Sequence, residues 1–387
     1  MAVGIPVHWG RSIHDSARMM GLPAPEVLEA CWQRALAETG REDLLLPMRG
    51  GFTGCIAEIR GALPGPLTVL RVDIDCCDLR ECGEADHRPA REGFASVHEN
   101  CMHACGHDAH AAIGVGAARL LWQRRRTLRG TVRILFQSAE EGLRGAASMT
   151  AAGAIEGVDH LFGVHTGILQ APVGTVAVSV RGFLSSTKLD VIFHGLSAHA
   201  GICPEKGRNA LAAAARAALD LLDIPGHLEG VCRVNVGTFH AGTGRNVVPD
   251  LARLAIETRG ETAQINAQAE ERAYALCRAA AERYGCTVEF RPMGGAGGAV
   301  CDAALARRAA EVLRGVEGVT EILEDVPFGG GEDVTTMMAA VQARGGQATE
   351  LLLPCGHSAP HHNSRFDMDE TVIPLGAEVL ARLAMEI

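Results

Sequence analysis

One short stretch of the chain, from Met102 to His110, combines a thiol, three imidazoles and a carboxylate within nine residues. The thiolate of Cys105 and the neutral imidazole of His107 lie two positions apart, so both can bind the same divalent cation. Asp108, or a carboxylate from elsewhere in the chain, could orient the imidazole through its other ring nitrogen. The alternative is a histidine-rich surface loop that binds no metal. We predict a metal site in this stretch.

Polar side chains also follow apolar segments that are typical of buried parallel strands. Residues 67–73 end in Asp73 and lead into Asp75, and residues 160–164 lead into His165. Folds with parallel sheets bind ligands at the carboxyl ends of their strands, so these side chains are expected to meet. Taken alone, the two aspartates could equally cap a helix.

A third apolar segment, 131–136, is followed by the adjacent carboxylates Glu140 and Glu141. Neighbouring side chains at a strand end point in different directions, so one carboxylate can bind a metal while the other acts as a general base. The alternative is a solvated acidic pair.

Further imidazoles, those of His357, His361 and His362, lie in a turn-rich segment before the last helix. Together with the earlier residues they complete two ligand sets that share one thiolate, as a two-ion site with ions about 3.5–4 Å apart requires. A mixed set of thiolate, imidazole and carboxylate suits Zn or Mn, and its softness favours Zn at the cysteine side. The predicted ligands are Cys105, His107, Glu141, His165 and His362.

The composition narrows the class of protein. With 387 residues, 47% hydrophobic and 21% charged, the chain is expected to be globular and to form two domains. A net charge of −10 argues against a nucleic-acid partner, and the one basic run, 124–126, is short. No apolar run reaches the ~18 residues of a membrane span. Thirteen cysteines without a signal peptide suggest a cytoplasmic protein with reduced thiols.

The pattern of apolar residues predicts an α/β fold with an inserted domain. In the main domain, residues 1–183 and 294–387, helices are expected at 24–38, 109–123 and 370–384, and strands at 54–59, 67–73, 131–136 and 160–164. The metal motif then lies at a helix amino end, where the helix dipole would favour the thiolate of Cys105. The inserted domain, 184–293, has strands at 189–193, 232–239, 251–257 and 287–290 and helices at 209–222 and 262–284. This β-α-β-β-α-β order is typical of a small split βαβ sandwich, and the glycine run 294–298 is expected to be a hinge.

Several separated motifs occur together in an order that resembles one known family. The chain is similar to the amidohydrolase branch of the zinc-aminoacylase and carboxypeptidase G clan, which includes hippurate and indole-3-acetyl-amino-acid hydrolases. Within this branch, the chain looks most like the p-aminobenzoyl-glutamate hydrolases. The motifs are Arg71–Asp75, Met102–His110, Gln137–Glu141, Gly163–His165, Gly195–Gly201, Gly244–Asp250, Glu332–Asp333 and His362–Glu370.

The resemblance implies a di-metal catalytic domain with a mixed, largely parallel sheet and an inserted lid or dimerisation domain. It implies that Cys105 bridges two ions, that His107 and Glu141 complete one site, and that His165 and His362 complete the other. The family pattern places the last ligand four residues before an aromatic residue, here Phe366, so His361 is a weaker candidate than its neighbour. The resemblance begins at about Arg49, because the preceding residues lack the family's His-x-x-Pro-Glu segment.

By the same resemblance, Glu140 is the general base and Asp75 orients a site imidazole. In the lid, His199 would polarise the scissile carbonyl, while Asn246 and Arg259 would bind the substrate. Some of these residues act across the interface in relatives with dimeric lids. A homodimer, or a heteromer with a related subunit, is therefore expected. Arg259 could instead pair locally with Glu257 or Glu261.

The expected reaction is metal-dependent hydrolysis of the amide bond of N-acyl or N-aroyl amino acids, such as p-aminobenzoyl-glutamate, indole-3-acetyl-aspartate or hippurate-like substrates. The alternatives are hydrolysis of another C–N bond on a small aromatic substrate, a non-catalytic metal-binding homologue, and a thiol catalyst built on Cys76 and Cys77. The last would be active without metal. A second carboxylate beside the ligand Glu141 favours an enzyme, because binding the ions would not need Glu140.

Overall fold

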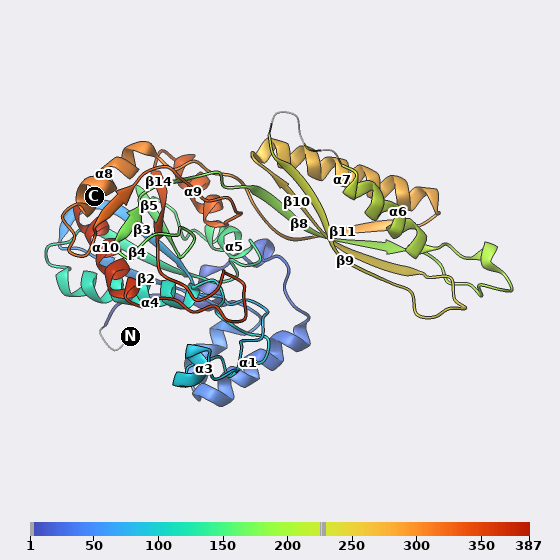
Figure 1. Ribbon diagram of the computed structural model, residues 1–387, viewed down its shortest axis with the longest axis horizontal. Helices are drawn as coiled ribbons and strands as arrows, with labels where there is room; N and C mark the ends of the chain where they lie inside the picture. Colours follow the sequence, from blue (N-terminus) through green and yellow to red (C-terminus); the bar gives the residue numbers. More distant parts are fainter. Residues whose placement is uncertain (1–3, 225, 227–229) are drawn as a thin grey trace. The chain divides into compact units, whose positions relative to one another are not determined.

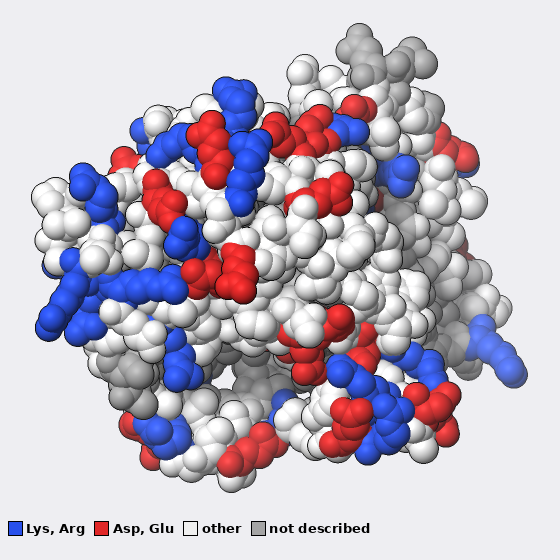
Figure 2. All heavy atoms as spheres, turned by 60° about the vertical axis from the view of Figure 1, so that its left-hand side comes forward, with Lys and Arg blue, Asp and Glu red and all other residues white. Residues whose placement is uncertain are grey.

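The computed structural model describes residues 4–224, 226 and 230–387. The chain divides into two compact units: unit 1 is Met1–Phe183 with Ala299–Ile387, and unit 2 is Leu184–Gly298. Among the described residues, no helix combines the length and the apolar character needed to cross a membrane. On the face shown in Figure 2, acidic and basic side chains are interspersed over much of the surface.

Unit 1 contains an eight-stranded sheet with the order β1-β2-β4-β3-β5-β14-β6-β12. Its four central strands, β4, β3, β5 and β14, are parallel to one another. Because both faces of these strands are covered by helices, the strands are almost continuously apolar. The strands are β1 Val7–Trp9, β2 Cys55–Arg60, β3 Leu63–Asp73, β4 Arg129–Gln137, β5 His160–Thr166, β6 Thr175–Ala177, β12 Glu321–Leu323 and β14 Gln347–Leu353. A separate pair is formed by β7 Val180–Arg181 and β13 Val326–Pro327.

Helices pack on both faces of this sheet (Figure 1). One apolar core includes α4 (His107–Arg124), α8 (Ala303–Leu313) and α10 (Val372–Glu386). A second core includes α5 (Gly145–Ala151) and α9 (Val334–Gln342). The remaining helices are α1 Pro25–Thr39, α2 Glu42–Leu45 and α3 Arg88–Glu92, with short 3-10 turns at Gly10–Ile13, Ser16–Arg18 and Leu46–Met48.

Unit 2 is an antiparallel sheet with the order β11-β8-β10-β9, covered on one face by two helices (Figure 1). Its core joins apolar residues of β8, such as Val191 and Phe193, to the alanines of α6 and α7. The predicted β-α-β-β-α-β order is confirmed. The elements are β8 Ser185–His194, a 3-10 turn Pro204–Lys206, α6 Ala210–Leu222, β9 Cys232–Ala241, β10 Leu251–Gly260, α7 Ala263–Arg283 and β11 Thr287–Ala296.

The glycine run after Met293 is not the predicted hinge along its whole length. Gly294 and Gly295 continue β11 and pair with Lys188 and Thr187 of β8, after a bulge at Pro292. Residues that are paired within a sheet cannot act as a hinge, so the prediction was wrong for these two glycines. Unit 2 accordingly extends to Gly298.

Candidate metal centre

The candidate site lies in unit 1, at the edge where three neighbouring parallel strands end. Strands β4, β3 and β5 end at Gln137, Asp73 and Thr166, and the loops that follow lie close together. Helix α4 begins beside them, after Gly106 with φ +87°. A Cβ atom at that glycine would lie 2.7 Å from the Thr166 hydroxyl, so only glycine allows this approach of the Cys105–His107 turn.

Three of the predicted ligands form one buried group. Ligand atoms of Cys105, His107 and His165 all lie within 4.8 Å of one another. The Cys105 Sγ and the His165 Nε2 are 3.6 Å apart. Residues about sixty positions apart in the sequence therefore converge as sulfur and nitrogen donors of one site.

A second group, Cys77, Glu141 and His362, forms beside the first. The Cys77 thiol donates to Glu141 Oε1 at 3.0 Å, and His362 Nε2 lies 3.3 Å from Glu141 Oε2. Burial opposes ionisation of Glu141, but these contacts outweigh it and lower its pKa to about 2. Cys77 was not among the predicted site residues. Cys77 follows Asp73 and Asp75 at a spacing of two residues, and this alternation was the signal in the sequence that could have identified it.

The two histidines near the carboxyl end face different partners. His362 lies next to Glu141, the carboxylate predicted for the other ion, and not in the group with His165. The His361 ring lies nearer to His165, with 5.7 Å between ring centroids. Burial lowers the pKa of His361 to about 4, so its imidazole is neutral.

His107 contacts Asp75, the residue expected to orient a site imidazole. His107 Nδ1 donates to the backbone oxygen of Asp75 at 3.1 Å, while the Asp75 Oδ1 atom is 3.6 Å away. Asp108 instead accepts from the Ala109 backbone and is exposed. His107 Nε2 is buried and has no hydrogen-bond partner within the described part of the chain.

A buried polar network that the sequence analysis did not identify supports this arrangement. His110 Nδ1 donates to Asp73, and His110 Nε2 accepts from the Thr166 backbone at 2.8 Å. The fully buried Arg71 donates to Asp73 at 2.9 Å and to Asp333 at 3.0 Å. A carboxylate at the strand end is thus fixed from two sides.

The predicted base, Glu140, is buried, and its Oε2 lies 4.0 Å from His107 Nε2. It sits in a tight turn between Ala139 and Leu143, which both adopt positive φ. Burial, and then the nearby carboxylates of Glu332 and Asp333, raise the pKa of Glu140 well above its ordinary value. A bound cation would lower this pKa again and keep the carboxylate ionised, as a general base must be to accept a proton.

The charge distribution fits a bound cation. Burial, followed by Glu141 and Glu140, raises the pKa of the Cys105 thiol far above its usual range, so the expected effect of the helix dipole is outweighed. Burial lowers the pKa of His107, but Asp73 and Asp75 raise it to about 9. Divalent cations would compensate this excess of negative charge, and the His107 Nε2 atom is available as a ligand.

The three predicted substrate residues lie in unit 2, in two separate places. His199 and Asn246 lie close together, because Ala200 N donates to the backbone oxygen of Asn246 at 2.9 Å and His199 forms a β-bridge with Val247. Both residues are exposed. Arg259 lies on β10, where it donates to both carboxylate oxygens of Glu257 at 2.9 and 3.0 Å. The local ion pair with Glu257, which was the alternative role for Arg259, is therefore present.

These two places are at opposite ends of the sheet. Leu251, at the start of β10, pairs with His194, and the chain segments with His199 and Asn246 continue beyond that end. Arg259 is eight residues further along the strand, which corresponds to roughly 27 Å at ~3.4 Å per residue. One small molecule cannot contact both ends of the same unit 2.

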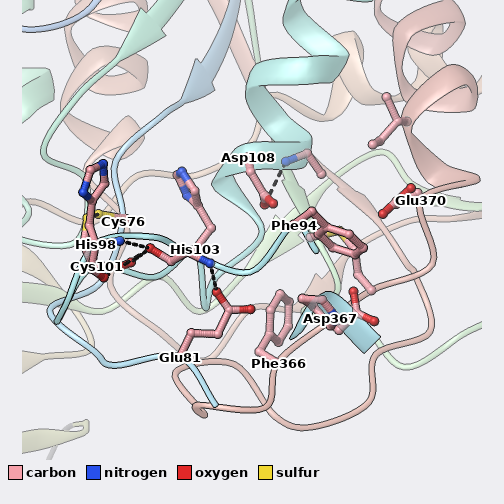
Figure 3. Close-up of a pocket in the computed structure, with 15 residues that line it drawn as sticks. Cys76, Glu81, Phe94, His98, Cys101, His103, Asp108, Phe366, Asp367 and Glu370 are labelled. Atoms are coloured by element: carbon pink, nitrogen blue, oxygen red, sulfur yellow. Dashed lines mark hydrogen bonds between the residues drawn. The ribbon is translucent and has the colours of Figure 1, made fainter. Parts of the chain in front are cut away.

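A cavity of about 340 Å³ in unit 1 is drawn in Figure 3. Phe94 and Phe366 line it, and so do Cys76 and Cys101, whose sulfur atoms are 2.9 Å apart. Cys77 contacts Glu141, and both Cys76 and Cys77 also line a second cavity, next to Glu141 and His362.

Comparison with known proteins places the chain in a family of peptidases. A family model described as peptidase family M20/M25/M40 matches residues 69–386. The indole-3-acetyl-aspartic acid hydrolase of Enterobacter agglomerans is 44% identical, and one of the subunits of the p-aminobenzoyl-glutamate hydrolase of Escherichia coli is 43% identical. Each alignment covers 99% of this chain and 88% of the relative. The similarity therefore also includes residues before Arg49, where the motifs alone placed its start.

Solved structures agree with this result. An aminobenzoyl-glutamate utilization protein from Klebsiella pneumoniae superposes with a TM-score of 0.84 and 38% identity, covering 99% of this chain and 87% of that protein. A dinuclear metal-binding M20 peptidase from Bacillus subtilis superposes with a TM-score of 0.64 and 26% identity, covering 95% and 93%. The chain belongs to peptidase family M20/M25/M40.

Proposed function

We propose that this chain hydrolyses the amide bond of N-acyl and N-aroyl amino acids with the help of two divalent ions, Zn or Mn. The observation that carries the proposal is a buried carboxylate, Glu140, beside two converging ligand groups. The relatives named for indole-3-acetyl-aspartate and p-aminobenzoyl-glutamate support the same chemistry. The reaction would take place in the cytoplasm on a small-molecule substrate.

The ions would be held by Cys105, His107, Glu141, His165 and His362, with Cys105 shared between them. When bound, they would supply an acidified water and an electrophile for the amide carbonyl. Glu140 removes a proton from the attacking water and returns it to the leaving amine, so the products are a carboxylate and a free amino acid. Asp75 keeps the His107 ring oriented through its backbone oxygen.

The substrate contacts from unit 2 support an assembly of two chains. His199 would stabilise the oxyanion, Asn246 would bind the substrate, and Arg259 would bind its carboxylate. Because the first two lie at the opposite end of the sheet from Arg259, a substrate contacting all three needs two copies of unit 2. A homodimer, or a heteromer with a related subunit, meets this condition.

The proposal is tested by metal analysis together with a substrate screen. The purified protein should bind close to two divalent ions per chain and hydrolyse N-acyl or N-aroyl derivatives of glutamate, aspartate or neutral amino acids. A chelator should abolish activity, and added Zn or Mn should restore it. Hydrolysis that persists in a chelator would contradict the proposal and would support a thiol catalyst.

Cys105→Ser should lower the metal content at both sites together. A serine hydroxyl is a harder and poorly ionised ligand, so it bridges two ions less well than a thiolate. Metal content per chain is measured after dialysis against a fixed free-metal concentration. Cys355→Ser, a change of another buried cysteine, is the control and should keep both ions. Loss of one ion while the other stays tight would rule out the bridging role.

Arg259→Lys should lower kcat/KM for substrates with a free carboxylate by roughly tenfold or more, mainly through KM, because lysine keeps the charge but loses the two-pronged donor geometry. Only two of its N–H groups are used by Glu257, so others remain for a substrate. A substrate amidated at that carboxylate should respond little. Arg253→Lys, on the same strand, is the matched control. Equal losses on both substrates would show a structural role only.

A further inference from the structure

An apolar cavity of about 220 Å³ lies in the part of unit 1 built by the amino-terminal segment. Met19, Met20, Leu22 and Leu28 line one side of it. Leu22 keeps 46% of its surface exposed, although it borders a concave site. Neither the metal chemistry nor the proposed substrate contacts of unit 2 use these side chains.

This cavity adjoins the cleft at the candidate metal centre. The cleft, about 540 Å³ in volume, is lined by Glu141 and His362. Four residues line both spaces, and two of them, Ser138 and Ala139, directly precede the predicted base; the shared residues are Thr53, Ser138, Ala139 and Arg144. The apolar cavity therefore lies next to the place where the amide of a substrate would sit at the metal centre.

Two polar side chains in the wall of the cavity, His14 and Arg144, have partners in the surrounding structure. His14 is hydrogen-bonded through both ring nitrogens, to the Ser148 hydroxyl at 2.9 Å and to the Thr53 backbone oxygen at 2.7 Å. Arg144 Nη1 donates to the backbone oxygen of Gly21. These contacts fix the walls, and they leave mainly apolar surface for a ligand.

We propose that this cavity binds the aromatic ring of the substrate's acyl group, and that it makes the enzyme prefer N-aroyl and arylacetyl substrates over N-acetyl ones. An apolar cavity of about 150 Å³ is known to hold benzene, so the space here accepts a substituted aromatic ring. A carboxylate-bearing amino-acid side chain would lose its hydration there, with the guanidinium of Arg144 as its one charged partner in the lining. The inference rests on the proposed amidase function.

Two other arrangements of the substrate are the alternatives to this inference. If Arg144 gripped a substrate carboxylate, the cavity would hold the amino-acid side of the substrate. The larger cavity of Figure 3 is the other candidate for an aromatic ring, but it shares only Cys76 with the cleft at the metal centre.

The test compares Leu28→Trp, which fills the cavity, with Val27→Trp on the same helix. Val27 is 51% exposed and does not line the cavity. The probes are p-aminobenzoyl-glutamate and acetyl-glutamate, which share the leaving amino acid. Leu28→Trp should lower the ratio of their kcat/KM values at least tenfold, through KM of the aroyl substrate, and Val27→Trp should leave the ratio unchanged.

A ratio that does not change in Leu28→Trp, with metal content and melting temperature retained, overturns the inference. The inference is also overturned if the loss of kcat/KM in Leu28→Trp differs between p-aminobenzoyl-glutamate and p-aminobenzoyl-aspartate. That outcome would assign the cavity to the amino-acid side of the substrate. A wild-type protein that cleaves neither probe refutes the proposed function itself, which is a distinct result.

A second variant keeps the test decisive if Leu28→Trp does not fold. Leu28→Ala enlarges the cavity, so the kcat/KM ratio of naphthoyl-glutamate to benzoyl-glutamate should rise severalfold. An unchanged ratio in this folded variant overturns the inference equally.

Discussion

Glu140→Gln is expected to reduce kcat by about 10²–10⁴ while both metal ions stay bound, which is the usual contribution of a positioned general base. The amide keeps the size of the side chain but cannot accept the proton of the attacking water. In the structure, Glu140 belongs to a group with His107 and Glu141 and is held in a tight turn, so the substitution should change chemistry more than shape. Single-turnover kinetics and metal analysis on the same sample provide the measurement.

The adjacent residue offers a matched control. Glu141→Gln removes a predicted ligand, so it should lower metal content as well as activity. If Glu140→Gln retained its activity with both ions bound, the base would have to be another residue. If both variants lost metal equally, the division of roles between the two carboxylates would be wrong.

Arg71→Met is expected to destabilise the protein by about 3–5 kcal/mol, because it leaves buried carboxylates without their counter-charge. The side chain of Arg71 is fully buried and contacts Asp73, Glu332 and Asp333 at 2.9–3.0 Å. The free energy of unfolding is measured by chemical denaturation with a chelator present, so that metal loss does not contribute. Arg60→Met, which removes a largely exposed arginine from its ion pair with Glu58, should cost no more than ~1 kcal/mol.

The loss in Arg71→Met should also depend on pH. Burial raises the pKa of Glu332 to about 7 and of Asp333 to about 6, although Arg71 opposes the rise. The folded state therefore binds more protons than the unfolded state between about pH 4 and 7, and stability falls as pH rises through this window. Without Arg71 these pKa values rise further, so the variant should lose more stability at pH 8 than at pH 5. A loss that is equal at both pH values would contradict this account.

Much of this protein could be predicted from local sequence patterns. The period of the apolar residues identified the elements of unit 2 in their correct order, because each period belongs to one type of element. The residues after parallel strands were expected to meet, since such strands end at one edge of a sheet. Cys105, His107 and His165 accordingly form one group.

Other features were decided only by tertiary structure. The glycines after Met293 extend a strand because Lys188 and Thr187 lie opposite them, and this pairing leaves no mark in the glycine run itself. Which of the two histidines, His361 or His362, faces Glu141 depends on a loop whose second histidine has a φ of +60°.

The buried network and the apolar cavity also depend on contacts between distant segments. Arg71 meets Asp333 across 262 positions of sequence, and Arg144 meets Gly21 across 123. Periodicity describes which face of an element is buried, but it carries no information about which distant segment covers that face. The sequence by itself therefore determined the elements and the chemistry of the candidate site, and the tertiary structure decided which side chains hold that site in place and what lies beside it.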